Sequence, residues 1–449
     1  DARILIGVVF ALGFGLIWFA DRLPGIMPMH EQPPEKVITF DPTYTDDERK
    51  MYMLFEHGGA KAHDAITEVV RTRDTRFIAP LVDVMRMIET RALFRGGLTD
   101  IILALDQLSG EKLRGIPGTR ELTANQWVPW IGHHLELVPP PGYVEWKGRL
   151  FGAIDPAYQY IFYEGVPTAI RVEEILYRGG GFDSPMSLID PVTVAGNKAA
   201  GLSPDEPVFG LEINGEARAY PHRFLDAHEI VNDVVGDVPI SLVYCTMCGA
   251  AIAYDGRASN GQTYTFGSAG LVYRSNSLIF DRETQTLWNH LEGRPVVGEL
   301  AGTDTKLTQL PLVTASWADW QEMHPQTEVL VMEPAERRQY LLGEPYGFYF
   351  RSSRERFPLW ETDDRMPLKA RVFGLRVGED LKAYRLSDLT DRRVVNDVVA
   401  GQSMTLIAPR GSVQVTAELT FGRRRIRRTV SYDAGGEVRA YQADGHHFQ

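Results

Sequence analysis

The only two cysteines of this 449-residue chain, Cys245 and Cys248, lie in the segment VYCTMCGAAIAYD, residues 243–255. Two cysteines at this spacing can hold a metal ion, exchange electrons with other thiols or form a structural disulfide. A structural zinc site takes four ligands, so the cysteines need partners. Three histidines are candidates for that role, namely His228 and, less favoured, His222 and His290. Three alternatives stay open: a disulfide or structural thiols without metal, one bound zinc, copper or iron ion, and a working redox pair.

A second group of polar side chains follows in the segment YRSNSLIFDRET, which starts at Tyr273 and is flanked by apolar, strand-forming residues. We expect five of its residues to line a cleft together with the cysteines: Arg274, Ser275, Asn276, Asp281 and Arg282. A buried ion-pair network explains them equally well. The chain has no phosphate-binding Gly-rich loop, no G-x-S-x-G elbow and no H-E-x-x-H helix. The lack of these motifs favours a protein that is not an enzyme, without deciding the question.

The cysteine segment belongs to the first of two similar stretches. VFGLEINGEARAYPHRFLDAHEIVNDVVG, from Val208, matches VFGLRVGEDLKAYRLSDLTDRRVVNDVVA, from Val372, without a gap. An ungapped match of this length predicts two copies of one β-rich unit. The first copy covers residues 206–336 and the second copy residues 337–449. Asn232-Asp233 recurs as Asn396-Asp397, which favours a hydrogen-bonding role in the shared fold over a catalytic one.

The second copy lacks the candidate ligands of the first. The two cysteines correspond to Pro409 and Ser412, and two of the histidines correspond to Leu386 and Arg392. The shared fold therefore does not need these ligands, and the first copy carries something extra. The matching segment MTLIAPRGSVQV is typical of strand, tight turn, strand. We therefore expect the cysteines on a turn between strands, unlike a thioredoxin-type pair, which opens a helix.

The N-terminal residues are typical of a membrane anchor followed by a tether. Residues 4–20 are apolar and uncharged, which is long enough for a short membrane span. We predict an uncleaved transmembrane helix at residues 1–22 and a Pro-rich tether at residues 23–44. The glycines permit close packing on another helix, and the tryptophan suits the membrane interface. The anchor residues singled out are Ile4, Gly7, Gly13, Gly15 and Trp18.

The middle of the chain changes from a helical to a strand-like pattern. Apolar residues in DTRFIAPLVDVMRMI recur at three- and four-residue spacing, which predicts a helical, HEAT-like domain at residues 45–137. An ordinary helical bundle is the alternative. VPPPGYVEW, from Val138, opens a connecting segment at residues 138–205, where alternating aromatic and β-branched residues predict mostly strand. The fold class is therefore α+β, with helices before the β-rich double unit.

Four segments resemble the bacterial and archaeal family called domain of unknown function 3179, over about residues 180–433. They are EPVFGLEINGEARAYP, HEIVNDVVGDVPISLVYCTMCGAAIAYD, FGSAGLVYRSNSLIFDRETQTLWNHLEGRPVVGELAG and SWADWQEMHP. The residues at family positions are His228, Cys245, Cys248, Gly249, Arg274, Ser275, Asn276, Asp281, Arg282 and Trp288. His222 departs from the pattern, which weakens it as a ligand. The resemblance implies a unit with a cysteine turn and no accepted activity.

These features together favour an accessory subunit over a catalyst. A net charge of −12 argues against nucleic acid as a partner, and the basic run at residues 423–428 alternates like an exposed strand. We expect a single-pass membrane protein with its bulk on the extracytoplasmic, periplasmic side. Its expected partners are the lipid bilayer and other subunits of a membrane complex, respiratory or photosynthetic, bound through the anchor and the helical domain. The alternative is an envelope protein that handles thiols or metals at the cysteine site.

Overall fold

The computed structural model describes part of the chain, and every statement on structure below concerns that part. The described residues are 43–54, 60–93, 97–115, 122–332, 340, 346, 349, 352–353, 355–408, 413–421, 424–432 and 439–442. The chain divides into two compact units, Asp1–Tyr44 and Thr45–Gln449, and all elements named here lie in the second. None of the described helices has the length and apolar character that a membrane crossing requires. The predicted anchor, with Ile4, Gly7, Gly13, Gly15 and Trp18, lies outside the described residues.

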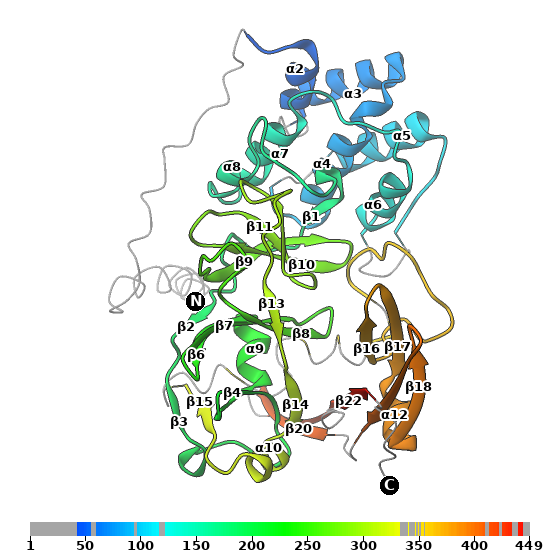
Figure 1. Cartoon of the computed structure of the whole chain (residues 1–449). Helices are drawn as coiled ribbons and strands as arrows, with labels where there is room; N and C mark the ends of the chain where they lie inside the picture. The colour runs from blue at the N-terminus through cyan, green and yellow to red at the C-terminus, as the bar shows by residue number, and fades with distance from the viewer. Residues whose placement is uncertain are drawn as a thin grey trace, which may run out of the picture. The chain divides into compact units, whose positions relative to one another are not determined.

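The second unit begins with a helical region, which runs to Ile161 (Figure 1). Its helices are α2 (Asp46–Met53), α3 (Ala60–Thr72), α4 (Ile78–Glu89), α5 (Leu98–Ser109), α6 (Ala124–His133), α7 (Tyr143–Gly152) and α8 (Tyr158–Ile161). The central helix is α4, which contacts α5, α6 and α7 and is buried along most of its length. The apolar spacing that predicted this helix reflects that burial. The HEAT-type repeat stays a prediction, because packing around one central helix does not require it.

The prediction of mostly strand from Val138 onward was wrong for the start of that segment, where α7 and α8 form. Gly142 has a left-handed φ of 81° and begins α7 directly after the prolines. Tyr143, Trp146 and Leu150 are buried, and their spacing is that of one helix face. The indole Nε1 of Trp146 donates to the carbonyl oxygen of Met51 over 2.7 Å, which ties α7 to α2. Tertiary packing of large apolar side chains here outweighs their strand propensity.

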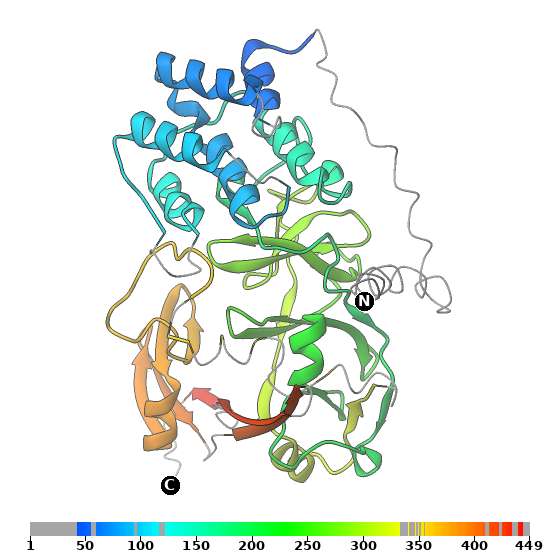
Figure 2. The same ribbon diagram turned by 180° about the vertical axis from the view of Figure 1, so that it is seen from behind.

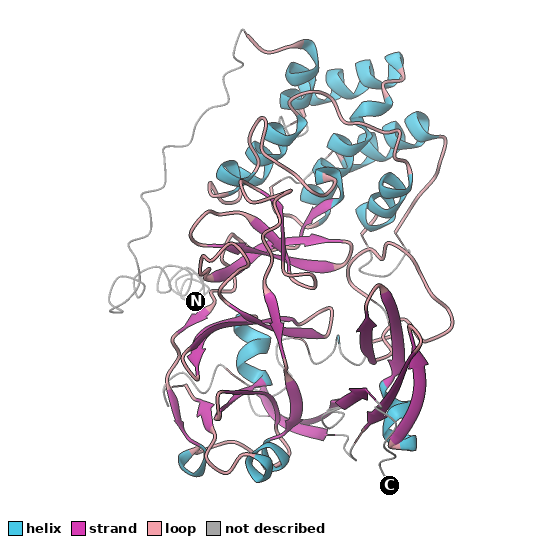
Figure 3. Ribbon diagram, viewed as in Figure 1, coloured by secondary structure: helices cyan, strands magenta, loops and turns pink. Residues whose placement is uncertain are grey.

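Strands dominate the chain after the helices (Figure 3). Through the first copy they are β1 (Ile175–Tyr177), β2 (Leu188–Ile189), β3 (Thr193–Ala195), β4 (Pro207–Ile213), β5 (Glu216–Pro221), β6 (Ile230–Val235), β7 (Val238–Cys245), β8 (Ala250–Asp255), β9 (Phe266–Tyr273), β10 (Asn276–Asp281), β11 (Leu287–Asn289), β12 (Arg294–Val297), β13 (Thr308–Leu310), β14 (Val313–Ser316) and β15 (Glu328–Leu330). Helix α9 (His222–His228) follows β5, and α10 (Trp317–Met323) follows β14. The sheet orders are β1-β9-β10-β11-β12, β13-β8-β7-β6-β2 and β14-β4-β5-β15-β3. The molecule is thus α+β with a β-rich C-terminal region.

The second copy repeats five consecutive elements of the first in the same order. They are β16 (Val372–Val377), β17 (Asp380–Arg385), α12 (Leu386–Arg392), β18 (Val394–Val399) and β19 (Gln402–Ile407). They appear in brown to orange in Figure 1 and from behind in Figure 2. Three further strands follow: β20 (Val413–Phe421), β21 (Arg424–Tyr432) and β22 (Arg439–Gln442).

The register of strand pairing is the same in both copies. Val208 pairs with Pro221 in the first, and the corresponding Val372 pairs with Arg385 in the second. The hairpins β6–β7 and β18–β19 agree in the same way, residue for residue. The strand pairing of the two copies differs after this point. In the first copy β7 pairs with β8, whereas in the second β19 pairs with β22 and β20 pairs with β21. The expected strand–turn–strand over MTLIAPRGSVQV therefore does not form as one hairpin.

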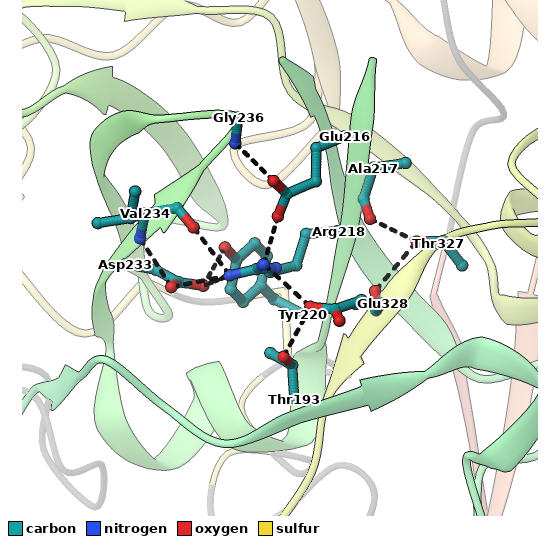
Figure 4. Close-up of polar contacts among 10 residues, drawn as sticks. All are labelled: Thr193, Glu216, Ala217, Arg218, Tyr220, Asp233, Val234, Gly236, Thr327 and Glu328. Atoms are coloured by element: carbon teal, nitrogen blue, oxygen red, sulfur yellow. Dashed lines mark hydrogen bonds and ion pairs between the residues drawn. The ribbon is translucent and has the colours of Figure 1, made fainter. Parts of the chain in front are cut away.

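A buried arginine ties three strands of the first copy together (Figure 4). Arg218 donates two hydrogen bonds of 2.9 Å to the carboxylate of Asp233 and lies 3.0 Å from Glu328. The hydroxyl of Tyr220 donates to the same Asp233 carboxylate over 2.8 Å. The neighbouring Asn232 is also bonded, since its side chain donates to the carbonyl oxygen of Phe266 over 2.9 Å. These contacts confirm the hydrogen-bonding role predicted for Asn232 and Asp233.

Candidate functional site

The cysteines lie on a turn between two antiparallel strands, as the repeat predicts. Cys245 ends β7 and pairs with Ala250, the first residue of β8. The backbone N–H groups of Cys248 and Gly249 donate to the carbonyl oxygen of Cys245 over 3.1 and 2.9 Å. Gly249 has a φ of 66°, a left-handed conformation that glycine adopts without strain. The sulfurs of Cys245 and Cys248 are joined in a disulfide across this turn.

The environments of the two sulfurs differ. Cys245 is 3% exposed, whereas Cys248 is only half-buried. The hydroxyl of Ser277 donates to Sγ of Cys245 over 3.2 Å, and Sγ of Cys248 lies 3.2 Å from the carbonyl oxygen of Ser275. A hydroxyl donor at the buried sulfur stabilises the thiolate that forms when the disulfide is reduced. The disulfide therefore has one accessible sulfur and one suited to leave as a thiolate.

The β9–β10 hairpin places these contacts. Arg274 and Ser275 form its two-residue turn, both with positive φ, which suits the twist of the flanking strands. The guanidinium of Arg274 pairs with Glu174 over 2.9 Å and stacks on the ring of Trp360 at 3.7 Å. These contacts hold the turn against the disulfide.

The three candidate histidines make the following contacts in the described structure. The ring nitrogens of His228 lie 2.8 Å from the carbonyl oxygen of Met186 and 2.7 Å from the hydroxyl of Tyr340. His222 is buried against the ring of Phe209, and burial lowers its pKa to about 3. Burial also lowers the pKa of His290 to about 4, and its Nδ1 lies 3.2 Å from the Ser277 carbonyl oxygen. Among the described residues, no three His, Cys, Asp or Glu side chains are placed to hold a metal ion.

The five polar residues predicted to share a cleft lie at the two ends of β10. Arg274, Ser275 and Asn276 lie at the cysteine end, where the Asn276 amide donates to the carbonyl oxygen of Arg274 over 3.2 Å. At the other end, the buried Asp281 carboxylate accepts from Nε1 of Trp288 over 2.7 Å.

Arg282 also lies at this far end of β10, where it pairs with Asp183 over 2.8 Å. Asp281 and Arg282 thus have different partners at this end of β10.

A cavity of about 480 Å³ lies beside the cysteine turn. Its lining is Arg178, Gly179, Gly180, Ser184, Pro185, Asp226, Ala227, Met247, Tyr346 and Arg356. Met247 belongs to the cysteine turn, and Asp226 belongs to α9. Cavities of this size accommodate small-molecule ligands.

Asp226 is the feature of this site that sequence reasoning missed. It is 2% exposed, and neither carboxyl oxygen has a hydrogen-bond partner within the described structure. Burial raises the pKa of Asp226 well above its ordinary range, because buried surroundings disfavour the ionised form. The repeat carried one signal, because the second copy has Thr390 at the corresponding position. A residue that differs between copies is not required by the fold that they share.

The site and fold define an α+β protein whose β-rich region carries a disulfide turn next to a polar cavity. Residues 186–448 match the model of a family described as a protein of unknown function, DUF3179. The match covers more than half of the chain, so the chain belongs to this family, as its motifs predicted. No curated protein and no solved structure matches the chain. The family description assigns no activity to any residue.

Proposed function

We propose that this protein is a membrane-anchored, extracytoplasmic accessory subunit that binds another subunit of a membrane complex through its second copy. The supporting observation is a difference between the copies. In the first copy, β2 pairs in parallel with the outer edge of β6. In the second copy, β18 is the corresponding strand, and it ends its sheet among the described residues. This edge of the duplicated unit thus pairs with another strand in the first copy. In the second copy it is an open edge, with which no described strand pairs.

Apolar side chains accompany the open edge. Val394 is 50% exposed, whereas Ile230, which corresponds to it in the first copy, is 1% exposed. Val398 is 60% exposed, and its counterpart Val234 is 47% exposed, so this second position is exposed in both copies. An exposed edge strand with apolar side chains is a template for pairing with another chain. Strand addition to such an edge is a common mode of protein recognition.

The occupant that we propose is an extended segment of a partner subunit, running parallel to β18 as β2 runs beside β6. Backbone hydrogen bonds supply the affinity in this mode, and side chains supply the specificity. Arg392 and Arg393 are exposed directly before β18, so an acidic residue in the segment would complement them. The predicted anchor at residues 1–22 would add contacts within the bilayer.

Val398→Glu tests this proposal. The change puts a carboxylate on the edge where an acidic segment is expected, so it should abolish association with the complex. Val234→Glu is the matched control, because Val234 holds the same position on β6, is also exposed, and lies on the strand already paired with β2. Blue-native electrophoresis of gently solubilised native membranes gives the readout. Retention of Val398→Glu in the large complex, or migration of the wild type as a monomer, would contradict the proposal.

A second candidate function is thiol–disulfide exchange at the cysteine turn, supported by the unequal environments of the two sulfurs. A thiolate of a partner dithiol attacks Sγ of Cys248, and a mixed disulfide forms. The bond to Cys245 breaks, and its electron pair leaves on Sγ of Cys245, next to the Ser277 hydroxyl. The second thiol of the partner then resolves the mixed disulfide, so the partner is oxidised and both cysteines end reduced.

Single-cysteine variants test this candidate. Cys245→Ser leaves the half-buried Cys248 thiol and should react with a maleimide about tenfold or more faster than Cys248→Ser, which leaves the buried thiol. Ser277→Ala should slow reduction of the intact disulfide by dithiothreitol about tenfold, because the leaving thiolate loses a hydrogen bond. Equal maleimide rates, or no effect of Ser277→Ala, would exclude exchange in this direction.

A further inference from the structure

We propose that the cavity beside the cysteine turn binds a small carboxylate anion. This inference is independent of the subunit proposal, since it rests on groups that neither candidate function uses. The groups that carry it are Asp226, Arg356 and Tyr346, which line the same cavity.

The buried position of Asp226 lowers the stability of the protein without ligand. A buried polar group without a hydrogen-bond partner loses its hydration and gains nothing in exchange, which costs about 1–3 kcal/mol. Such a group contributes no stability to the fold, so its presence at a cavity indicates a ligand that supplies the missing bond. Because burial favours the protonated form of this carboxyl group, the group is suited to donate one O–H.

The other polar groups of the cavity are donors as well. Arg356 has an exposed side chain with no ion-pair partner among the described residues. Burial raises the pKa of Tyr346, so its hydroxyl also keeps its proton. The second arginine of the lining, Arg178, is already paired with Glu229 over 2.7 Å and donates to Ser268 over 3.0 Å. Among the described residues, the cavity therefore holds one guanidinium without an ion-pair partner, that of Arg356, and two O–H donors, Asp226 and Tyr346.

This donor set fits a carboxylate in particular. The planar fork of a guanidinium matches the two oxygens of a carboxylate. A protonated carboxyl group donates its O–H to a carboxylate oxygen in a charge-assisted hydrogen bond. The single uncompensated guanidinium balances one negative charge, whereas a phosphate dianion would carry two. A volume of about 480 Å³ leaves room for a small organic acid.

Calorimetric titration of the purified full chain with sodium propionate, sodium acetate and inorganic phosphate tests the inference. We expect saturable binding of at least one of the two carboxylates, and weaker or no binding of phosphate. Arg356→Gln should weaken carboxylate binding about tenfold or more, because it removes a charge-assisted hydrogen bond. Its side chain is exposed, so the variant should fold as the wild type does.

Asp226→Leu separates a binding role from a structural one. It should also weaken carboxylate binding about tenfold, yet leave the thermal midpoint unchanged or raised, since it removes an unsatisfied buried group. Asp281→Leu is the matched control. Asp281 is equally buried but accepts hydrogen bonds from Trp288 and Thr284, so its loss should lower the midpoint. Phosphate binding tighter than both carboxylates, no binding of any probe, or a midpoint lowered by Asp226→Leu as much as by Asp281→Leu would overturn the inference.

Discussion

Asp83→Ala is expected to lower the free energy of unfolding by about 3–5 kcal/mol, because it leaves a buried ammonium group without its counter-ion. Nζ of Lys147 lies 3.0 Å from the Asp83 carboxylate, and both side chains are almost fully buried. Tyr143 and Val172 hold the ammonium from other sides, over 3.2 and 2.9 Å. The pair joins α4 to α7, so its loss should loosen the packing of the helical region.

Urea unfolding followed by circular dichroism measures this effect. Glu145→Ala is the control, because it breaks the ion pair with Arg149, in which both side chains are well exposed, and should cost less than about 1 kcal/mol. The double variant Asp83→Leu with Lys147→Met should recover most of the lost stability, since no buried charge remains. A loss of under about 1 kcal/mol for Asp83→Ala would show that water reaches the ammonium and that the pair is not sealed.

Equivalent glycines of the two copies are expected to respond to alanine with opposite signs. A Cβ on Gly210 in β4 would overlap the six-membered ring of Trp320, whereas a Cβ on Gly374 in β16 meets no atom of the described residues within 4 Å. Gly210→Ala should therefore destabilise by about 1–3 kcal/mol through overpacking. Gly374→Ala should stabilise by about 0.5–1 kcal/mol, because alanine loses less backbone entropy in a strand.

Thermal and urea unfolding of the two alanine variants against the wild type give both signs in one experiment. Trp320 is buried and donates to the hydroxyl of Thr327 over 2.9 Å, so it cannot move aside without breaking that bond. Trp320→Phe should leave Gly210→Ala less harmful, because the smaller ring gives way. Destabilisation by both alanine variants to the same extent would mean that a second ring covers Gly374, and that the second copy is closed like the first.

The family, the repeat and the cysteine turn could all be predicted from the sequence, because each depends on the order of residues within a short segment. An ungapped match between Val208 and Val372 carries strand lengths, turn positions and the helix between them, so the register of both copies follows. The turn at Cys245 and Cys248 was predicted from the corresponding segment of the second copy, and it forms in the first copy although that segment does not pair as one hairpin in the second. The buried stripe of α4 followed from its period.

The helix at Tyr143–Gly152 and the division of the polar residues along β10 depended on tertiary contacts. Aromatic residues suit both strands and buried helices, so only the neighbours that bury Trp146 decide between them. A cleft of Arg274 with Asp281 looked reasonable from their closeness in sequence. A strand separates its ends by about 3.3 Å per residue, however, and gives each end its own partners.

The composition of the chain and its internal repeat determined the fold class and the repeated β-rich unit. Only the tertiary structure decided which polar groups lack a hydrogen-bond partner and which strand edge lacks a neighbour in the described part of the chain. In the sequence, Asp226 is an ordinary polar residue of a short helix. In the structure, burial removes its hydrating water, and no described neighbour supplies a hydrogen bond in place of that water. The open edge of β18 likewise follows from the absence of a strand like β2 beside it in the described structure. Both features are properties of what surrounds a residue, and surroundings are set by segments far away in sequence that the local pattern does not encode.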